Sequence, residues 1–147
     1  MELIIRDARM EDIPALEVLE RQCFSMPWTA EQLIGQLPDK NHRFVVAERA
    51  GELLGYVGMM FVLDEGYISN VATAPAARRQ GIGRALITAL MEQARELELS
   101  FVTLEVRRSN EPAKALYAQQ GFMPVGERKD YYQRPKEDAI LMTKFLK

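Results

Sequence analysis

The sequence has little of the chemistry that metals, disulfides or imidazole catalysis require. Its 147 residues include one cysteine, Cys23, and one histidine, His42. A single cysteine excludes an internal disulfide and is typical of a reducing compartment. A zinc site needs several thiolate or imidazole ligands, so we expect no metal. A catalytic triad would have to use His42, whose polar neighbours, residues 39–43, indicate a solvated loop instead.

Long apolar runs and an excess of positive charge are also missing. No apolar stretch approaches the roughly 20 residues of a membrane-spanning helix, and the first residues lack the basic and apolar regions of a secretory signal. The formal net charge is -2, whereas nucleic-acid binding usually needs a basic face. We therefore expect a cytoplasmic protein that contacts neither a membrane nor nucleic acid directly.

The pattern of the remaining residues indicates one α/β domain over residues 1–147. Apolar and β-branched runs predict strands at residues 3–6, 44–47, 53–62, 68–73, 101–106, 122–126 and 139–143. Helical periodicity predicts helices at residues 12–23, 29–37, 82–94 and 111–120. This order of elements predicts a central mixed sheet flanked by about four helices. The charged segment 128–138 is expected to be a loop.

Side chains at the expected helix starts sharpen three of these boundaries. Asp12, Thr29 and Asn110 are candidate N-caps, and Thr29 is followed three positions later by Gln32, the spacing of a capping box. Gly121 takes the position that often follows a helix end. The nearly continuous apolar run at residues 101–106 is typical of a strand covered on both faces.

A glycine-rich stretch with three arginines, residues 78–86, begins the longest helix. Glycines let backbone N–H groups approach a ligand, and a helix N-terminus favours an anion. A P-loop would need a lysine and a hydroxyl after Gly83, and a dinucleotide fingerprint would need glycine at Leu86. The pattern that is left, Arg-x-x-Gly-x-Gly at Arg78, Gly81 and Gly83, fits either a pyrophosphate-binding loop or an ordinary basic loop.

Two further residues carry candidate chemistry. Glu105 interrupts an apolar strand, where an ionised carboxylate is costly unless it is paired or functional. It could equally pair with Arg107 or Arg108, or face solvent. Tyr117 lies in the pattern Asn-x-x-Ala-x-x-Leu-Tyr-x-x-x-Gly-Phe, residues 110–122, and could equally be a core aromatic.

These two motifs, in this order, resemble the signatures of the GCN5-related N-acetyltransferase (GNAT) superfamily, over nearly the whole chain. The segments Met26-Pro27-Trp28-Thr29, Leu104-Glu105-Val106-Arg107, Ala115-Leu116-Tyr117 and Tyr131-Tyr132 are similar to its RimI-type branch. That branch acetylates the N-terminal alanine of the eighteenth small-subunit ribosomal protein. Lys129-Asp130 and Thr73-Ala74-Pro75 depart from its pattern, which puts substrate detail in doubt more than the chemistry.

The resemblance implies a mostly antiparallel sheet with one splayed parallel pair of strands, and acetyl transfer from acetyl-CoA by direct attack of the amine. It makes Glu105 the proton acceptor and Tyr117 the proton donor. The acetyl-CoA contacts that it implies are Val71, Ala72, Thr73, Arg78, Arg79, Gln80, Gly81, Ile82, Gly83, Arg84 and Asn110.

The substrate side is less well described by the sequence. Trp28, Tyr131 and Tyr132 lie in segments that could close over a peptide, although Trp28 could equally pack in the core. Asp64 and Glu65 could attract a basic peptide or form a solvated turn. Two other functions stay open: acetylation of a small-molecule amine, and non-catalytic binding of acyl-CoA.

Overall fold

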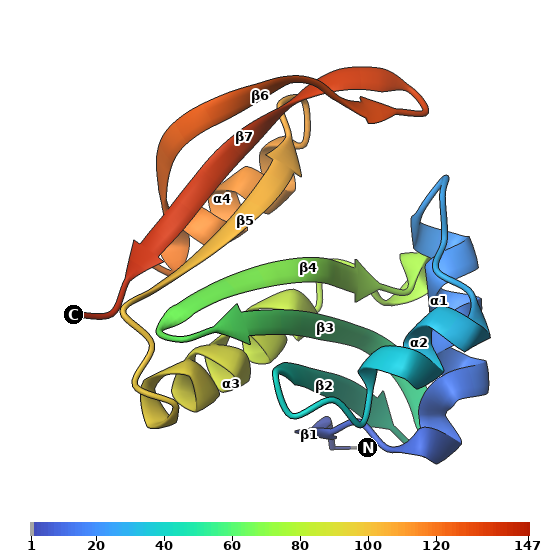
Figure 1. Cartoon of the computed structure of the whole chain (residues 1–147). Coiled ribbons are helices and arrows are strands. Elements are labelled where there is room, and N and C mark those ends of the chain that lie inside the picture. Colours follow the sequence, from blue (N-terminus) through green and yellow to red (C-terminus); the bar gives the residue numbers. More distant parts are fainter. Residues whose placement is uncertain (1) are drawn as a thin grey trace.

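The computed structural model describes residues 2–147, which form a seven-stranded sheet in the order β1-β2-β3-β4-β5-β7-β6 (Figure 1). The strands are β1 Ile4–Asp7, β2 His42–Arg49, β3 Glu52–Val62, β4 Glu65–Thr73, β5 Phe101–Arg107, β6 Met123–Gln133 and β7 Lys136–Phe145. The α-helices are α1 Ile13–Cys23, α2 Ala30–Gln36, α3 Ile82–Glu96 and α4 Glu111–Gln119. Two short 3-10 helices, Met10–Asp12 and Pro75–Ala77, precede α1 and α3. The expected mixed α/β fold is confirmed.

The sheet opens in its middle. β4 and β5 are its one parallel pair, and they pair only from Glu65 with Phe101 to Tyr67 with Thr103. Beyond Tyr67 the two strands diverge, and Figure 1 shows them as the arms of a V. All other neighbours pair antiparallel, over four to eight registered positions. The predicted splayed pair is therefore present, and it leaves a gap between two central strands of the sheet.

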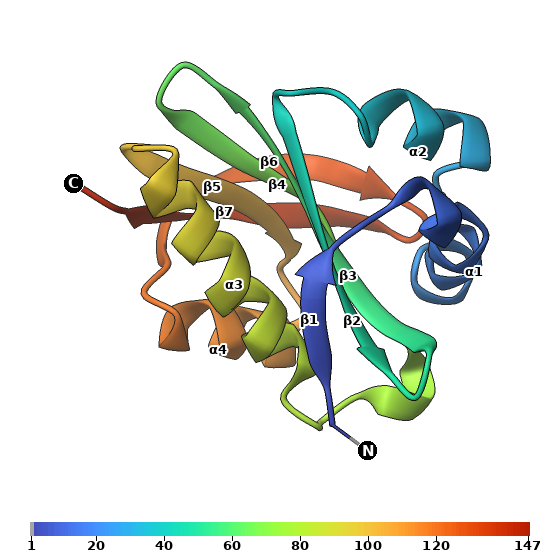
Figure 2. The ribbon, with the colours of Figure 1, turned by 90° about the horizontal axis from the view of Figure 1, so that it is seen from below.

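The helices divide between the two faces of the sheet (Figure 2). α3 and α4 pack on one face with the larger core cluster, which includes Ile82, Leu86 and Tyr117. α1 and α2 pack on the other face with a second cluster that includes Leu16 and Leu33. Among residues 2–147 no helix is long and apolar enough to span a membrane.

Most predicted helix boundaries are confirmed. The Thr29 hydroxyl accepts from the Gln32 backbone N–H at 3.3 Å, and the Thr29 N–H donates to the Gln32 side chain at 2.9 Å. Asn110 accepts from the Ala113 N–H at 3.2 Å. Asp12 takes the predicted N-cap position of α1, but its carboxylate makes no capping hydrogen bond there. The guanidinium of Arg6 and the Arg9 N–H bind it instead, at 2.9 and 2.7 Å.

Two strand predictions also need correction. The segment 128–138 is not a loop: it extends β6 and β7, which turn only at Arg134 and Pro135. Its exposed, charged ribbon lacks the apolar alternation that identifies a strand in sequence. β5 is fully buried on one face only, because Val102, Leu104 and Val106 alternate with half-buried residues. Its other face lines a cavity.

A β-bulge at Ser69 changes which face of the sheet the side chains of β4 point to. Gly58 pairs with Asn70 and Met59 with Ile68, so Ser69 is the extra residue. Before the bulge, Ile68 packs with the α3 cluster, whereas after it Ala72 packs with the α1 cluster. An extra residue reverses the alternation of side chains along a strand. Tyr67 and Asn70 consequently face the α1 side, although three positions separate them.

Candidate active site

The opening between β4 and β5 leads into a cavity of about 840 Å³, within the usual range for ligand clefts. β4, β5, α4 and the loop between α1 and α2 line it, together with the end of β6. The predicted site residues in its lining are Trp28, Val71, Glu105, Asn110, Tyr117, Tyr131 and Tyr132. These residues are up to 104 positions apart in sequence, and the fold brings them together.

Glu105 projects from β5 on the α1 side. Its side chain is only 4 % exposed, and Arg128 of β6 approaches its Oε2 at 3.7 Å. Neither of the predicted partners is used: Arg107 pairs with Glu137, and Arg108 pairs with Glu127. Among the described residues, Oε2 of Glu105 has no hydrogen-bond partner. The carboxylate is thus a buried acceptor at the cavity wall.

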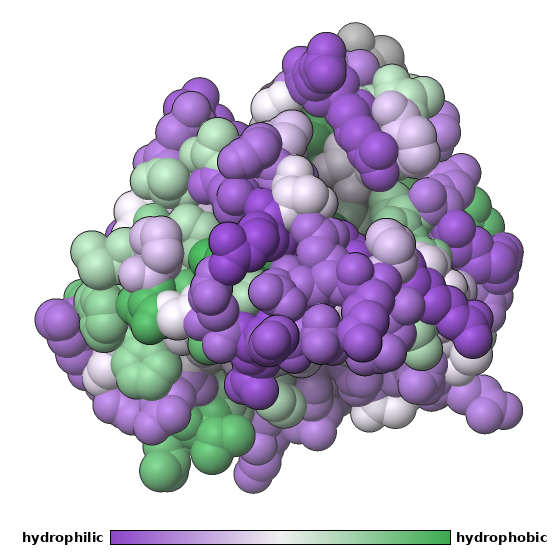
Figure 3. Space-filling model, turned by 90° about the horizontal axis from the view of Figure 1, so that it is seen from above, coloured by the Kyte–Doolittle hydropathy of each residue, from purple (hydrophilic) through white to green (hydrophobic). Residues whose placement is uncertain are grey.

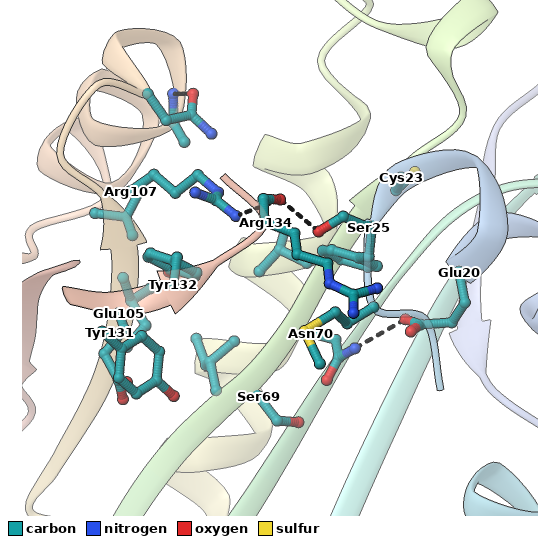
Figure 4. Close-up of a pocket in the computed structure, with 18 of the residues that line it drawn as sticks. Glu20, Cys23, Ser25, Ser69, Asn70, Glu105, Arg107, Tyr131, Tyr132 and Arg134 are labelled. Carbon is teal, nitrogen blue, oxygen red and sulfur yellow. Dashed lines mark hydrogen bonds between the residues drawn. The ribbon is translucent and has the colours of Figure 1, made fainter. Parts of the chain in front are cut away.

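Two tyrosines lie beside this carboxylate. The hydroxyl groups of Tyr67 on β4 and Tyr131 on β6 are 3.5 Å apart. Burial raises the pKa of Tyr67, and its neighbours Glu105 and Tyr131 raise it further. The pKa of Tyr131 is also raised, by burial first and then by Glu105. Both phenols therefore stay protonated at neutral pH and can donate to an acceptor next to Glu105; Figure 4 shows Tyr131 beside Glu105.

Tyr117 enters the cavity from the opposite side. It belongs to α4, is 6 % exposed, and packs within the larger core cluster with its ring 6.0 Å from that of Phe122. Burial raises its pKa, and the nearby Tyr132 adds to the shift. Tyr117 is thus a core aromatic, as one of the predicted alternatives has it, and it also lines the cavity.

The start of α3 has the properties of an anion site. Gly81 adopts φ +80°, and no side chain caps the first N–H groups of α3. Arg78, Arg79 and Arg84 form no salt bridge with any described residue. Free N–H groups with cations around them suit a pyrophosphate. This observation favours the pyrophosphate loop over an ordinary basic loop.

The end of β4 connects this anion site to the cavity. Val71 lines the cavity, whereas Ala72 is 1 % exposed and faces α1, so only its backbone is available for a ligand. The Thr73 carbonyl accepts from Arg78 Nε at 3.3 Å and from the Cys23 thiol at 3.3 Å. Beyond Tyr67, the β5 side of β4 has no strand partner. Backbone groups there can bind an acyl group instead.

Two loops meet over the cavity. The Ser25 hydroxyl, between α1 and α2, donates to the Arg134 carbonyl at the β6–β7 turn, 2.7 Å away. Arg107 holds the same turn by donating to the carbonyls of Arg134 and Pro135, at 3.2 and 2.8 Å. Its guanidinium also lies 4.2 Å from the ring centre of Tyr132. The face seen in Figure 3 is mostly hydrophilic, in keeping with this polar cover.

The structure separates the remaining predicted substrate residues from the cavity. Asp64 lies in the turn before β4, and its carboxylate accepts from the Ser100 hydroxyl at 2.5 Å. Glu65 starts β4 and pairs with Phe101 at the closed end of the V. Neither is in the cavity lining. Asp64 holds the chain that leads into β5.

Sequence reasoning missed Glu20, Tyr67, Asn70, Arg107 and Arg128 as site residues. A signal existed for Glu20: it lies four residues after Leu16 and three before Cys23, on the apolar stripe of α1. It is 1 % exposed. Tyr67 and Asn70 had no such signal, because the bulge that turns both toward Glu105 depends on pairing with β3.

No group of three or more histidine, cysteine or acidic side chains among residues 2–147 could hold a metal ion. The polar groups in the cavity lining include two carboxylates, four phenols and three carboxamides, from Glu20, Glu105, Tyr67, Tyr117, Tyr131, Tyr132, Asn70, Asn110 and Gln133. Such a set can accept a proton, donate one and orient an amine. It can thus support acyl transfer by direct attack.

Comparison with known proteins agrees with this geometry. The model of the acetyltransferase (GNAT) family matches residues 13–122. The chain is 37 % identical over 139 residues to a putative bS18-alanine N-acetyltransferase of Bacillus subtilis, covering 94 % of this chain and 92 % of that protein. It is 32 % identical over 134 residues to the bS18-alanine N-acetyltransferase of Escherichia coli K12, covering 90 % of each.

Solved structures share the fold. The ribosomal-protein-S18-alanine N-acetyltransferase of Escherichia coli superimposes with a TM-score of 0.91 at 29 % identity, covering 99 % of this chain and 94 % of that one. Arabidopsis thaliana NAA60 in complex with acetyl-CoA gives a TM-score of 0.89 at 21 % identity, covering 99 % of each chain.

Proposed function

The chain belongs to the GNAT acetyltransferase family and is an acetyl-CoA-dependent N-acetyltransferase, and we propose that its acceptor is a protein N-terminal α-amine. The most direct candidate is the N-terminal alanine of ribosomal protein bS18, the substrate named for its relatives. The single observation that carries the proposal is the split between β4 and β5, where Glu105 and Tyr117 meet one cavity from two faces.

Residues at the end of β4 and the start of α3 suit acetyl-CoA. The uncapped N–H groups of α3 and the unpaired Arg78, Arg79 and Arg84 would hold the pyrophosphate. The backbone of Val71, Ala72 and Thr73 would align the pantetheine arm along β4. Asn110 caps α4 and lines the cavity, where its side chain would be available to the same arm.

The acceptor amine must lose a proton before it attacks. An α-amine has a pKa near 7.7–8.0 against about 10.4 for lysine, so deprotonation is easier by roughly 3–4 kcal/mol. Glu105 is the general base in this proposal, accepting the proton directly or through water. Its Oε2 has no hydrogen-bond donor among the described residues, which leaves it available for a proton.

Groups of β4 and α4 would contact the thioester. A backbone N–H near Val71, on the part of β4 without a β5 partner, would donate to the carbonyl oxygen and stabilise its developing charge. Tyr117 would donate to the departing sulfur. Because burial raises its pKa, the phenol stays protonated at neutral pH and would donate a hydrogen bond to the sulfur as it leaves.

The cover of the cavity supports a peptide acceptor. Ser25 and Arg134 join the α1–α2 loop to the β6–β7 turn, and Trp28, Tyr131 and Tyr132 lie in or beside these segments. A peptide N-terminus would enter below this bridge. Asp64 and Glu65 lie outside the cavity lining and have no part in this proposal.

The test uses acetyl-CoA with three acceptors: a peptide with a free N-terminal alanine, the same peptide blocked at the N-terminus but containing lysine, and a small polyamine. Thiol release is measured for each. We expect release with the free α-amine only. Release with the polyamine alone would make the protein a small-molecule acetyltransferase, and no release with any amine would favour acyl-CoA binding without catalysis.

A further inference from the structure

A buried carboxylate beside the cavity joins four segments of the chain. Glu20 of α1 is 1 % exposed and accepts three hydrogen bonds. The donors are the Tyr56 hydroxyl of β3, the Trp28 N–H of the α1–α2 loop at 2.7 Å and the Asn70 side chain of β4 at 2.8 Å. The proposed proton transfers use none of these groups.

The Glu20 carboxylate determines which end of the Asn70 amide faces it. A carboxylate only accepts hydrogen bonds, so the atom nearest to it must be the Nδ2 donor. Oδ1 therefore points the other way, as Figure 4 shows. Within residues 2–147, Oδ1 is buried and has no hydrogen-bond partner, although Asn70 is 7 % exposed and lines the cavity. Buried acceptors are rarely left without a donor.

The bulge at Ser69 puts this acceptor on the α1 side of the split. Glu105 projects on the same side from β5, since its neighbours Leu104 and Val106 are buried in the α3 cluster. Each diverging strand thus contributes one unpartnered acceptor, Oδ1 of Asn70 and Oε2 of Glu105. Both residues line the one cavity between the diverging strands.

We propose that Asn70 is a substrate-binding residue whose Oδ1 accepts a hydrogen bond from the reacting α-amine, and that Glu20 is the positioning residue that turns Oδ1 toward it. A neutral amine has two N–H groups and one lone pair. One N–H of the amine would bind Oε2 of Glu105 on β5, and the other would bind Oδ1 of Asn70 on β4. The lone pair of the nitrogen would then point between the two strands, toward the thioester. This inference rests on the proposed function, because it needs an amine acceptor in the cavity.

Glu20→Gln tests the orientation without removing bulk. The fixed Trp28 N–H must still meet an oxygen, so the nitrogen of the introduced amide then faces Tyr56 and Asn70. The Tyr56 hydroxyl can rotate to accept, and the Asn70 amide must flip to accept as well. Trp28, Tyr56 and Asn70 each keep a hydrogen bond to residue 20, but Asn70 now presents Nδ2 to the amine. We expect kcat/KM for the free-alanine peptide to fall about 10- to 50-fold, with the Kd of acetyl-CoA unchanged within twofold.

The double variant Glu20→Gln with Asn70→Asp exchanges the acid and the amide. One oxygen of the new carboxylate on β4 accepts from the new amide on α1, and the other again presents an acceptor to the cavity. We expect it to recover at least half of the lost kcat/KM on a logarithmic scale. Tyr56→Phe is the matched control, since it removes one donor to Glu20 but leaves Asn70 oriented; its kcat/KM should stay within threefold of the wild type.

Thermal unfolding of all three variants checks that they fold, and their kcat/KM values test the proposed role of Asn70. A Glu20→Gln kcat/KM within threefold of the wild type, or a double variant no more active than Glu20→Gln, would overturn the inference. So would an equal loss in Tyr56→Phe, since this would indicate a purely structural network. Absence of transfer to the peptide by the wild type would instead refute the proposed function, and this distinguishes the two failures.

Discussion

Glu105 and Tyr117 reach the same cavity from opposite faces of the sheet. Glu105 lies on the α1 side of β5, whereas Tyr117 packs from α4 in the cluster that buries Leu104 and Val106. The proposed proton acceptor and the proposed proton donor thus lie on either side of the split. This separation suits a reaction in which the amine enters from one side and the thiol leaves on the other.

Glu105→Gln is expected to lower kcat by about 10²–10⁴-fold, because the amide cannot accept the proton of the amine. The Kd of acetyl-CoA should change less than threefold, since the proposed pyrophosphate site lies at α3. Steady-state kinetics and calorimetric titration measure the two effects. Glu52→Gln, an exposed carboxylate on β3, is the matched control. Near-normal turnover in Glu105→Gln would remove Glu105 from the role of base.

Tyr117→Phe should lower kcat by about 10–100-fold with little change in the binding of acetyl-CoA, since only the hydroxyl that serves the leaving sulfur is lost. The ring still fills its place beside Phe122, so folding should be preserved. Single-turnover kinetics isolate the chemical step. An unchanged rate would mean that water protonates the thiolate.

The raised pKa of Tyr117 also has a consequence for stability at alkaline pH. The folded state retains a phenol proton that the unfolded chain releases near pH 10. This contribution is complete below pH 10 and declines as the pH rises toward the folded pKa, by about 1.4 kcal/mol per pH unit. Urea unfolding at pH 9, 10 and 11 should give a shallower decline for Tyr117→Phe than for the wild type. Identical declines would contradict the shift.

Gly81→Ala should weaken acetyl-CoA binding about 5- to 10-fold. An added Cβ would meet no atom within 4 Å, but φ is +80°, and a left-handed conformation costs a residue other than glycine roughly 1–2 kcal/mol. The strain would distort the start of α3. Gly35→Ala is the matched control, because it has equal space and no positive φ. It should stabilise α2 by about 0.5–1 kcal/mol and leave binding unchanged.

Arg107→Lys should raise the KM for the peptide about 5- to 20-fold and leave the Kd of acetyl-CoA unchanged. Lysine cannot donate in a fork to the Arg134 and Pro135 carbonyls while lying on Tyr132, so the β6–β7 turn would loosen. Arg108→Lys, at a neighbouring exposed ion pair, is the control. Equal effects of both substitutions would mean that the fork of Arg107 has no specific part in holding the β6–β7 turn.

Features that depend on near neighbours were predictable. The apolar spacing of Ile82, Leu86 and Leu90 predicted α3, and all three are buried. Thr29 and Asn110 cap the predicted helices. Helix faces and caps are set by residues three or four positions apart, which the sequence displays directly. Asp12 takes the N-cap position but does not cap α1, because a group outside the helix, Arg6, binds its carboxylate.

The sequence by itself determined the helices, most of the strands and the motifs that identify the family. Only the tertiary structure decided how these segments meet. Glu105 pairs with Arg128 of β6. The Glu20 carboxylate binds the nitrogen of the Asn70 amide, which leaves its oxygen free. The bulge at Ser69 places the Asn70 side chain on the α1 side of the sheet. Strand register and long-range pairing join residues that are 23 to 50 positions apart. The local sequence pattern does not indicate these long-range contacts.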